Sequence, residues 1–449
     1  MTASGTASRS LRRIFGVGFT IALAFGNTVG VGILRLPGTV AAALGGPALV
    51  APIWILGGLY ATLGAISVSE LAAMSPTAGG FYVYARRAFG RGFGFAIGWN
   101  DWIQNCITIA YVALTGAEFL TDLTHAPVIW RPVSAVAIIA LFAGLQWIGI
   151  RIGGLLQNSI SAAVGVLLIA LTVACFVIHP AIQPRPVAAG ALSSGHALAL
   201  SVGLVAGVTT ALRSVIVTYD GWYGAIYMAE ETLDAPRTIP RAMIGCAVLV
   251  TALYTLINLG FLHALPFAEL ARSTQPAADI AGLIIPGGGA QFVTIVSILT
   301  LLGLVNAILL VAPRILYAAG RDGLFTDRAT EIGAAGTPRL ALSLTALCAC
   351  ALVMSGTLQQ LVAVAAVIFV LNYVSTYVAL FVLRFKEPEA RRPFRAWGYP
   401  VSTGVVLAGS VIFLGLTIAE DHRSALYAAL LMVASAPVYA WLSRRKAQA

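Results

Sequence analysis

The stretches GNTVGVGI, from Gly26 to Ile33, and TYDGWYG, from Thr218 to Gly224, interrupt two apolar runs that are otherwise long enough to cross a membrane. Their glycine and polar residues predict that both helices unwind at these points. Unwinding frees backbone N–H and C=O groups, which hydrocarbon tolerates only where they line a cavity or bind a ligand. Matched interruptions in the two halves of a chain are typical of the binding site of a secondary transporter.

The composition predicts a membrane protein. Hydrophobic residues make up 59% of the chain and charged residues 10%, whereas soluble domains carry about 25% charged residues. A chain of 449 residues accommodates about twelve spans of roughly 20 residues with short connections. We therefore expect an all-α polytopic protein embedded in a lipid bilayer. The spans are expected at 14–43, 48–72, 93–121, 132–150, 154–178, 200–230, 241–264, 290–318, 340–356, 359–383, 399–418 and 424–442.

The distribution of Lys and Arg predicts the orientation of these spans. Most of the 27 basic residues fall in alternate connections and at the two ends of the chain. The connections expected outside hold only Arg131, Arg185, Arg272 and Arg423. The positive-inside rule then places both termini, 1–13 and 443–449, in the cytoplasm and the protein in the cytoplasmic membrane. The net charge of +10 is explained by this orientation, and no nucleic-acid partner is expected.

Several functional classes lack their motifs in this sequence. The five cysteines show no ligand-like spacing, so we expect no metal and no cofactor. The chain contains no GxSxG or HExxH motif, and its two lysines lie in no phosphate-binding loop. An enzyme or an ATP-driven pump is therefore not expected, and a solute gradient must supply the energy.

The two interruptions predict opposite electrostatic preferences. After the first one, around Gly30 and Gly32, the free amides at a helix N-terminus favour an anionic group such as a carboxylate. Before the second one, the carbonyls near Thr218 and Tyr219 favour an ammonium group. A site with both walls is complementary to an amino acid zwitterion. The alternative is that these glycines only allow close helix packing.

Charged residues inside the spans are costly and are candidates for gating or proton coupling. Asp220 lies in the second interruption, where it would bind an amine, carry a proton or cap the following helix. Arg35 and Arg213 lie in the outer halves of their spans. They would attract carboxylates, form an outer gate with Glu118 or Asp220, or make ordinary structural ion pairs.

Further acidic residues lie nearer the inner side. Asp101 and the pair Glu230 and Glu231 would either form ion pairs with Arg237, Arg241 or Arg314 or take part in proton coupling. Of these, Glu230 is the preferred candidate for a proton carrier.

Four motifs in this order resemble the amino acid/polyamine/organocation (APC) superfamily, most closely its L-type amino acid transporter branch. They are GNTVGVGILRLPG at Gly26, PTAGGFYVYARRAFG at Pro76, YDGW at Tyr219 followed by AEETLDAPRTIPRA at Ala229, and NAILLVAPRILYAAGRDG at Asn306. The resemblance implies a LeuT-type fold. In that fold, 14–180 and 200–384 form two inverted five-helix repeats with discontinuous first and sixth spans, and 399–442 contributes two appended helices. It also implies sodium-independent uptake or exchange of amino acids.

The resemblance also implies roles for individual residues. Thr28, Gly30, Val31 and Gly32 would contact the substrate carboxylate and part of the amine, and Ile33 adds an apolar neighbour. Thr218, Tyr219 and Gly221 would complete the amine site, and Trp222 or Tyr223 would shape the side-chain pocket. The chain departs from the family at Val164, where many members have a lysine. Proton coupling, exchange and an external sodium ion therefore all remain open.

These observations together predict a permease for L-amino acids that works by alternating access. A neutral substrate is favoured because polyamines lack a carboxylate and because Val31, Ile33, Trp222 and Tyr223 provide apolar surroundings. A cationic amino acid or polyamine transporter and a transport-inactive amino-acid sensor are the alternatives. The identity of the amino acid, the counter-substrate and the oligomeric state stay open.

Overall fold

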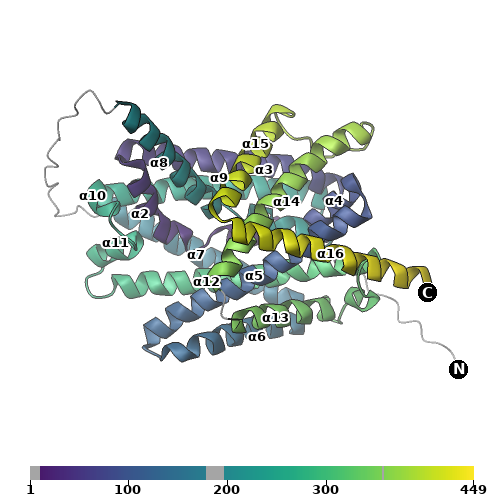
Figure 1. Cartoon of the computed structure of the whole chain (residues 1–449). Coiled ribbons are helices and arrows are strands. Elements are labelled where there is room, and N and C mark those ends of the chain that lie inside the picture. The colour runs from purple at the N-terminus through teal and green to yellow at the C-terminus, as the bar shows by residue number, and fades with distance from the viewer. Residues whose placement is uncertain (1–10, 178–196, 356–357, 449) are drawn as a thin grey trace.

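The computed structural model describes residues 11–177, 197–355 and 358–448, and these residues form a bundle of helices (Figure 1). Arg185 and most of the expected N-terminal cytoplasmic segment lie outside the described residues. The helices, in chain order, are α1 Val17–Thr28, α2 Gly32–Leu44, η1 Pro47–Leu49, α3 Val50–Met74, α4 Phe81–Phe89, α5 Arg91–Thr124, η2 Val128–Trp130, α6 Arg131–Ile148, α7 Ile150–Val177, α8 Ala197–Thr218, η3 Trp222–Glu231, α9 Ala235–Ala264, α10 Phe267–Leu270, α11 Pro276–Ile284, α12 Gly289–Arg321, η4 Asp327–Thr330, α13 Arg339–Met354, α14 Leu358–Lys386, α15 Val401–Glu420 and α16 His422–Gln448.

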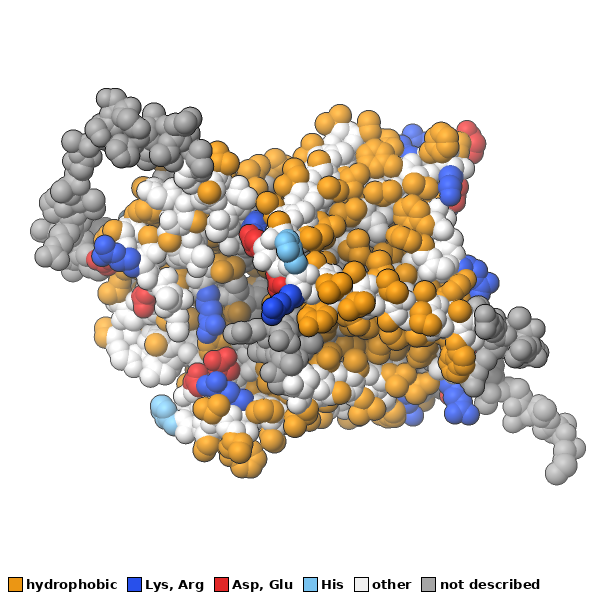
Figure 2. Space-filling model, in the orientation of Figure 1, with side chains coloured by type: hydrophobic (Ala, Val, Ile, Leu, Met, Phe, Trp, Pro, Cys, Tyr) orange, Lys and Arg blue, Asp and Glu red, His pale blue; other side chains and the backbone are white. Residues whose placement is uncertain are grey.

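Many of these helices are long and apolar enough to cross a membrane. Nine single helices within the described residues meet that condition, and α1 with α2 forms a tenth candidate that is bent by 47° at its break. The polytopic all-helical prediction is therefore confirmed. Figure 2 shows hydrophobic side chains spread widely over one face of the bundle, as contact with lipid requires.

The structure differs from the predicted spans at several points. Helix α13 is apolar but shorter than the helices that meet the membrane-crossing condition. The chain between α9 and α12, for which no span was predicted, contains the short helices α10 and α11. The expected span 200–230 ends as an α-helix at Thr218 and continues after the break as the 3-10 helix η3. Hydrophobicity alone does not predict where a helix ends or whether it is an α-helix or a 3-10 helix. It reports the preference of a segment for an apolar environment and not the hydrogen-bond pattern of the backbone.

Close approach between α4 and α5 depends on small residues. A Cβ atom added at Gly94 would lie 2.5 Å from the Cβ of Arg86, and one added at Gly98 would lie 2.8 Å from the ring of Tyr82. Gly90, which separates the two helices, has a φ of +94° that side chains disfavour. The four-residue glycine spacing in this region is therefore a packing feature.

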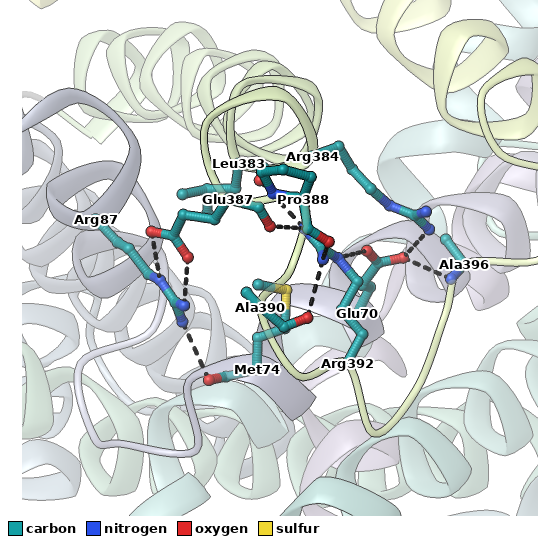
Figure 3. Close-up of polar contacts among 10 residues, drawn as sticks. All are labelled: Glu70, Met74, Arg87, Leu383, Arg384, Glu387, Pro388, Ala390, Arg392 and Ala396. Atoms are coloured by element: carbon teal, nitrogen blue, oxygen red, sulfur yellow. Dashed lines mark hydrogen bonds and ion pairs between the residues drawn. The ribbon is translucent and has the colours of Figure 1, made fainter.

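The end of the bundle that carries α4 is called here the basic end, after its arginines. Glu70, at the end of α3, is fully buried and joins this helix to the chain around the end of α14. Its carboxylate accepts hydrogen bonds from Arg384 at 2.7 Å, from Arg392 at 3.0 Å and from the backbone amide of Ala396 at 2.7 Å (Figure 3). One buried carboxylate thus fixes the connection between α14 and α15.

A second set of ion pairs joins α4 to the rest of the basic end. Arg87 pairs with Glu387 at 2.6 Å (Figure 3), and its hydrogen bonds hold the pKa of Glu387 below the ordinary value. Arg86 pairs with Asp322, which also accepts a hydrogen bond from the Tyr82 hydroxyl. These contacts hold α4 against α12 and α14.

The most deeply buried ion pair links α12 to the end of η3. Arg314 and Glu231 are each about 1% exposed, and the guanidinium donates to both carboxylate oxygens, at 3.0 and 3.1 Å. A bidentate geometry of this kind satisfies both charges where no water is available.

Removal of one partner is therefore expected to be severe. Glu231→Gln should lower the free energy of unfolding by about 3–5 kcal/mol, because it leaves a buried guanidinium unpaired. Arg87→Gln, which breaks the half-exposed pair with Glu387, should cost less than about 1 kcal/mol. Unfolding curves of the purified proteins in the same detergent measure both values, and equal small losses in the two variants would contradict this ranking.

Candidate functional site

The two predicted helix breaks lie in direct contact. Asn27, in the last turn of α1, donates a hydrogen bond from its side-chain nitrogen to the carbonyl of Gly221 at 2.9 Å. Gly221 has a φ of +111°, and a Cβ atom there would lie 2.1 Å from the carbonyl oxygen of Asn27. Gly221 is therefore required both for its backbone conformation and for the close approach of the two segments.

The helix ends next to the two breaks also approach each other. A Cβ atom at Gly32, the first residue of α2, would lie 3.2 Å from the side chain of Thr218, the last residue of α8. The N-terminal end of α2 thus lies beside the C-terminal end of α8. The first amides of α2 have no partner within that helix, and the last carbonyls of α8 have none within theirs. A partial positive and a partial negative end therefore face a common space.

That space is a cavity of about 290 Å³. It is large enough for a small molecule, and its wall combines backbone of the breaks with polar and apolar side chains of three long helices. The lining residues from the breaks are Asn27, Thr28, Gly30, Val31, Gly32, Leu36, Val217, Thr218, Asp220, Gly221 and Tyr223, and those from α5, α12 and α14 are Gln104, Asn105, Thr108, Tyr111, Val112, Leu301, Leu304, Ile308, Val362, Ala365, Ala366 and Phe369.

Three of the expected substrate contacts do not line this cavity. Ile33 is fully buried, and Tyr219 donates its hydroxyl to the carbonyl of Trp54 at 3.0 Å. Trp222 stacks on Tyr373, with the ring centroids 5.6 Å apart. These side chains pack behind the cavity wall, because residues on either side of a break point in different directions once the regular helix is lost.

The hydroxyls of the two threonines at the breaks bond to their own helices. Thr28 donates to the carbonyl of Ala24 at 2.7 Å, and Thr218 donates to that of Ser214 at 2.7 Å. Both residues line the cavity, and a hydroxyl oxygen that donates one hydrogen bond retains acceptor capacity. Asp220 also lines the cavity, and it accepts a hydrogen bond from the Tyr373 hydroxyl at 2.5 Å. The wall beside the second break is thus rich in acceptors.

The contribution of α5 was missed in the sequence. Gln104, Asn105, Thr108 and Tyr111 share one face of this helix and line the cavity. A run of polar residues three and four positions apart within an apolar span is a signal that could have identified them.

Of the alternatives left open for the outer arginines, the structure shows an ordinary ion pair for Arg213. It pairs with Glu420 and lies over the Phe413 ring, and the described residues show no ion pair of Arg213 with Glu118 or Asp220. Glu118 lies 3.7 Å from Arg131. Arg35 lies over the ring of Phe119, 4.5 Å from its centroid. None of these contacts is the outer gate between an arginine and Glu118 or Asp220 that the sequence allowed.

The acidic candidates nearer the basic end differ from one another. Glu230 pairs with Arg321 at 2.6 Å and accepts the backbone amide of Ala78. Asp101 is fully buried and accepts hydrogen bonds from Tyr227, Asn105 and Asn372. Of the ion pairs expected for this group, that of Glu231 with Arg314 is present.

A neutral network surrounds the position at which the family lysine is missing. Val164 is buried in α7. One turn earlier, Ser161 donates to the carbonyl of Ala22 in α1 at 2.8 Å. Two turns earlier, Gln157 accepts from Asn306 in α12 at 2.9 Å. Hydroxyl and amide groups therefore join α1, α7 and α12 in this region.

These features define a polytopic helical membrane protein with a ligand-sized cavity between two broken helices. A family model described as amino acid permease matches residues 15–441. The chain belongs to this family, which confirms the resemblance found in the four motifs and the expectation that the protein is not an enzyme.

Named relatives cover almost the full chain. It is 25% identical to the serine/threonine exchanger SteT of Bacillus subtilis over 98% of this chain and 99% of that protein. It is 26% identical to the human b(0,+)-type amino acid transporter 1, over 96% and 88%, respectively. It is 25% identical to the branched-chain amino acid permease BcaP of Lactococcus lactis, over 95% and 94%.

The contact between the breaks predicts different tolerances at neighbouring glycines. Gly221→Ala should prevent the two segments from meeting, because the added Cβ would overlap the backbone of Asn27. We expect a strong loss of folded protein, measured as the monodisperse fraction in size-exclusion chromatography. Gly144→Ala, at an exposed position of α6 with open space around it, is the matched control. A Gly221→Ala protein as stable as this control would contradict the assigned contact.

Proposed function

We propose that the protein is a secondary active transporter that carries neutral L-amino acids across the cytoplasmic membrane by alternating access. The observation that supports this most directly is the cavity between the ends of α2 and α8, next to the Asn27–Gly221 hydrogen bond that joins the two breaks. Membership of the amino acid permease family supports the same substrate class.

The electrostatics of the cavity define the orientation of the substrate. Its carboxylate binds the amides at Gly30, Val31 and Gly32, where the α2 dipole is positive. Its ammonium group binds the carbonyls and acceptors near Thr218 and Asp220, where the α8 dipole is negative. The substrate thereby satisfies backbone groups that the breaks leave free.

A neutral side chain fits the rest of the cavity. On the side of α12 and α14 the wall is formed by Leu301, Leu304 and Ile308 and by Val362 and Phe369. The α5 side adds the uncharged polar side chains of Gln104, Asn105, Thr108 and Tyr111. Neither side offers an ion partner for a charged side chain, and burying an unpaired charge is costly. A cationic substrate is the alternative, because Asp220 lines the same cavity.

The proposed architecture is that of twelve spans with both termini in the cytoplasm. Residues 14–180 and 200–384 form inverted repeats, and 399–442 adds two helices. The position of the two breaks, one in each proposed repeat, supports this arrangement. The basic end is then the cytoplasmic end, as the positive-inside rule requires.

Alternating access requires a closure that can open at the basic end. The backbone amides of Ile14 and Phe15 donate to the carbonyl of Glu231, at 2.9 and 3.0 Å, and the amide of Leu233 donates to Phe15. This short pairing holds the chain before α1 against the end of η3. Both segments lead directly to a break. Separation of this pairing would therefore open the cavity to the cytoplasm.

Uptake into proteoliposomes tests the proposal. A panel of radiolabelled L-amino acids is offered with an inward proton gradient, an inward sodium gradient or internal unlabelled amino acids. We expect uptake of neutral amino acids under at least one of these conditions. Binding without uptake in all of them would instead identify a sensor of the same fold.

The role of the amides at the first break is tested at Gly30. No atom lies within 4 Å of a Cβ added there, so Gly30→Val should fold normally while the new side chain fills the cavity. Transport should fall to background. Gly144→Val, at the exposed position of α6, should keep full transport. Wild-type uptake by a well-expressed Gly30→Val protein would rule out the assigned carboxylate site.

A further inference from the structure

Asp101 differs from the acids at the basic end because the partners that the described residues offer it are all neutral. Glu70, Glu231 and Glu230 each pair with arginine. Within the described residues, Asp101 forms no ion pair, although it is 0% exposed. A buried carboxylate without a cation is strongly disfavoured, and binding a proton removes that penalty.

The hydrogen bonds of Asp101 leave room for such a proton. Its Oδ1 atom accepts from Asn105 at 3.2 Å and from Asn372 at 3.3 Å. The Tyr227 hydroxyl lies 3.0 Å from Oδ1 and 2.9 Å from Oδ2, so its single hydrogen is shared between them, and it is the one donor that the described residues place at Oδ2. A proton on Oδ2 would therefore displace fewer donors than a proton on Oδ1.

A second observation identifies an acceptor for the protonated form. The side-chain oxygen of Asn372 is buried and has no hydrogen-bond partner in the part of the chain that the structure describes. Rotation of this amide by half a turn would present that oxygen to Asp101 in place of the nitrogen. Asn372 can therefore donate to the charged carboxylate and accept from the neutral acid, so both protonation states have a partner.

The charged and titratable groups around Asp101 are already committed or neutral. The titratable groups on the elements packed against α5 and on η3 include tyrosines, a cysteine and two paired arginines. They are Tyr84 and Arg86 of α4, Tyr223 and Tyr227 of η3, Arg314 of α12, Cys348 of α13, Tyr373 of α14 and Tyr439 of α16. Arg86 pairs with Asp322 and Arg314 with Glu231, so neither neutralises Asp101.

Asp101 is connected to the cavity without being part of its wall. Asn105, one turn along α5, lines the cavity and donates to Asp101. Tyr227 lies in η3 and packs against Tyr223, another lining residue, with ring centroids 6.3 Å apart. Asp220 is exposed to the cavity and can be neutralised by a substrate ammonium group. Asp101 is out of reach of the substrate.

We propose that Asp101 is the site of a proton that is carried together with the amino acid. The inference rests on the proposed transport function and names its coupling ion. The proton comes from water on the side to which the cavity is open and adds to Oδ2, which converts the carboxylate to a neutral acid. It returns to water on the opposite side after the basic end opens. The loss of charge on Asp101 weakens its hydrogen bond with the Tyr227 hydroxyl. That bond anchors η3, and the end of η3 forms the backbone pairing with Phe15.

The test measures proton movement and amino acid movement in the same proteoliposomes. A pH-sensitive dye is enclosed in the lumen, and the neutral amino acid that gives the highest uptake is added outside. Wild-type protein should acidify the lumen as it takes up substrate. Asp101→Asn, which mimics the neutral acid, should lose substrate-driven acidification and keep exchange of internal for external amino acid. Asp122→Asn, at the far end of the same helix, should behave as wild type.

Two results would overturn the inference. Wild-type uptake without acidification would show that no proton is carried, although the transport function would stand. Acidification by Asp101→Asn equal to that of wild type would place the proton elsewhere. Absence of all amino acid movement in the wild type would instead contradict the proposed function itself.

A second variant separates proton binding from a structural role. Tyr227→Phe removes the hydroxyl that stabilises the charged carboxylate but keeps Asp101 in place. The pH at which uptake is half-maximal should shift upward, because the neutral form is then favoured. A purely structural contact would lower the yield of folded protein and leave the pH profile of uptake unchanged.

Discussion

The contact between the two helix breaks is the constraint on which the rest of the site depends. Asn27 and Gly221 are joined by a hydrogen bond, and the space between their backbones does not admit a Cβ atom. This contact brings the start of α2 beside the end of α8 and gives one cavity two walls of opposite polarity. Without it, each break would expose unpaired backbone groups to hydrocarbon.

The distribution of buried charge differs between the basic end, where ion pairs join helices, and the region around the cavity. At the basic end, Glu70 and Glu231 are neutralised by arginines and fix the ends of α3, α14 and η3. Toward the cavity, Asp101 and Asp220 are surrounded by hydroxyl and amide groups. Permanent ion pairs suit a fixed contact. An acid with neutral partners can instead bind and release a proton, or pair with an ammonium group.

Much of the architecture follows from simple features of the sequence. Apolar segments of about 20 residues predict membrane helices, and glycines in two of them predicted the breaks at Gly30 and Gly221 that the structure contains. The backbone features of the site could therefore be predicted from the sequence, because the conformational freedom of glycine does not depend on its neighbours in the fold.

Side-chain partners were less predictable. For Arg213 the sequence left both a gate with Glu118 or Asp220 and an ordinary ion pair open, and the structure shows an ion pair with Glu420, which lies far away in the sequence. Tyr219 and Trp222 were expected in the substrate site and pack behind it. The direction of a side chain beyond a break depends on the local turn, and hydrophobic periodicity carries no information about that turn. The polar face of α5 could have been predicted from the spacing of its polar residues. It was missed because α5 is a continuous helix without a break.

The most direct test of the central claim is an electron cryo-microscopy structure of the protein with a transported neutral amino acid bound. The account predicts density between the two breaks, with the carboxylate on the amides of Gly30 to Gly32 and the ammonium group beside Thr218 and Asp220. Substrate density outside the cavity, or in the reverse orientation, would contradict it.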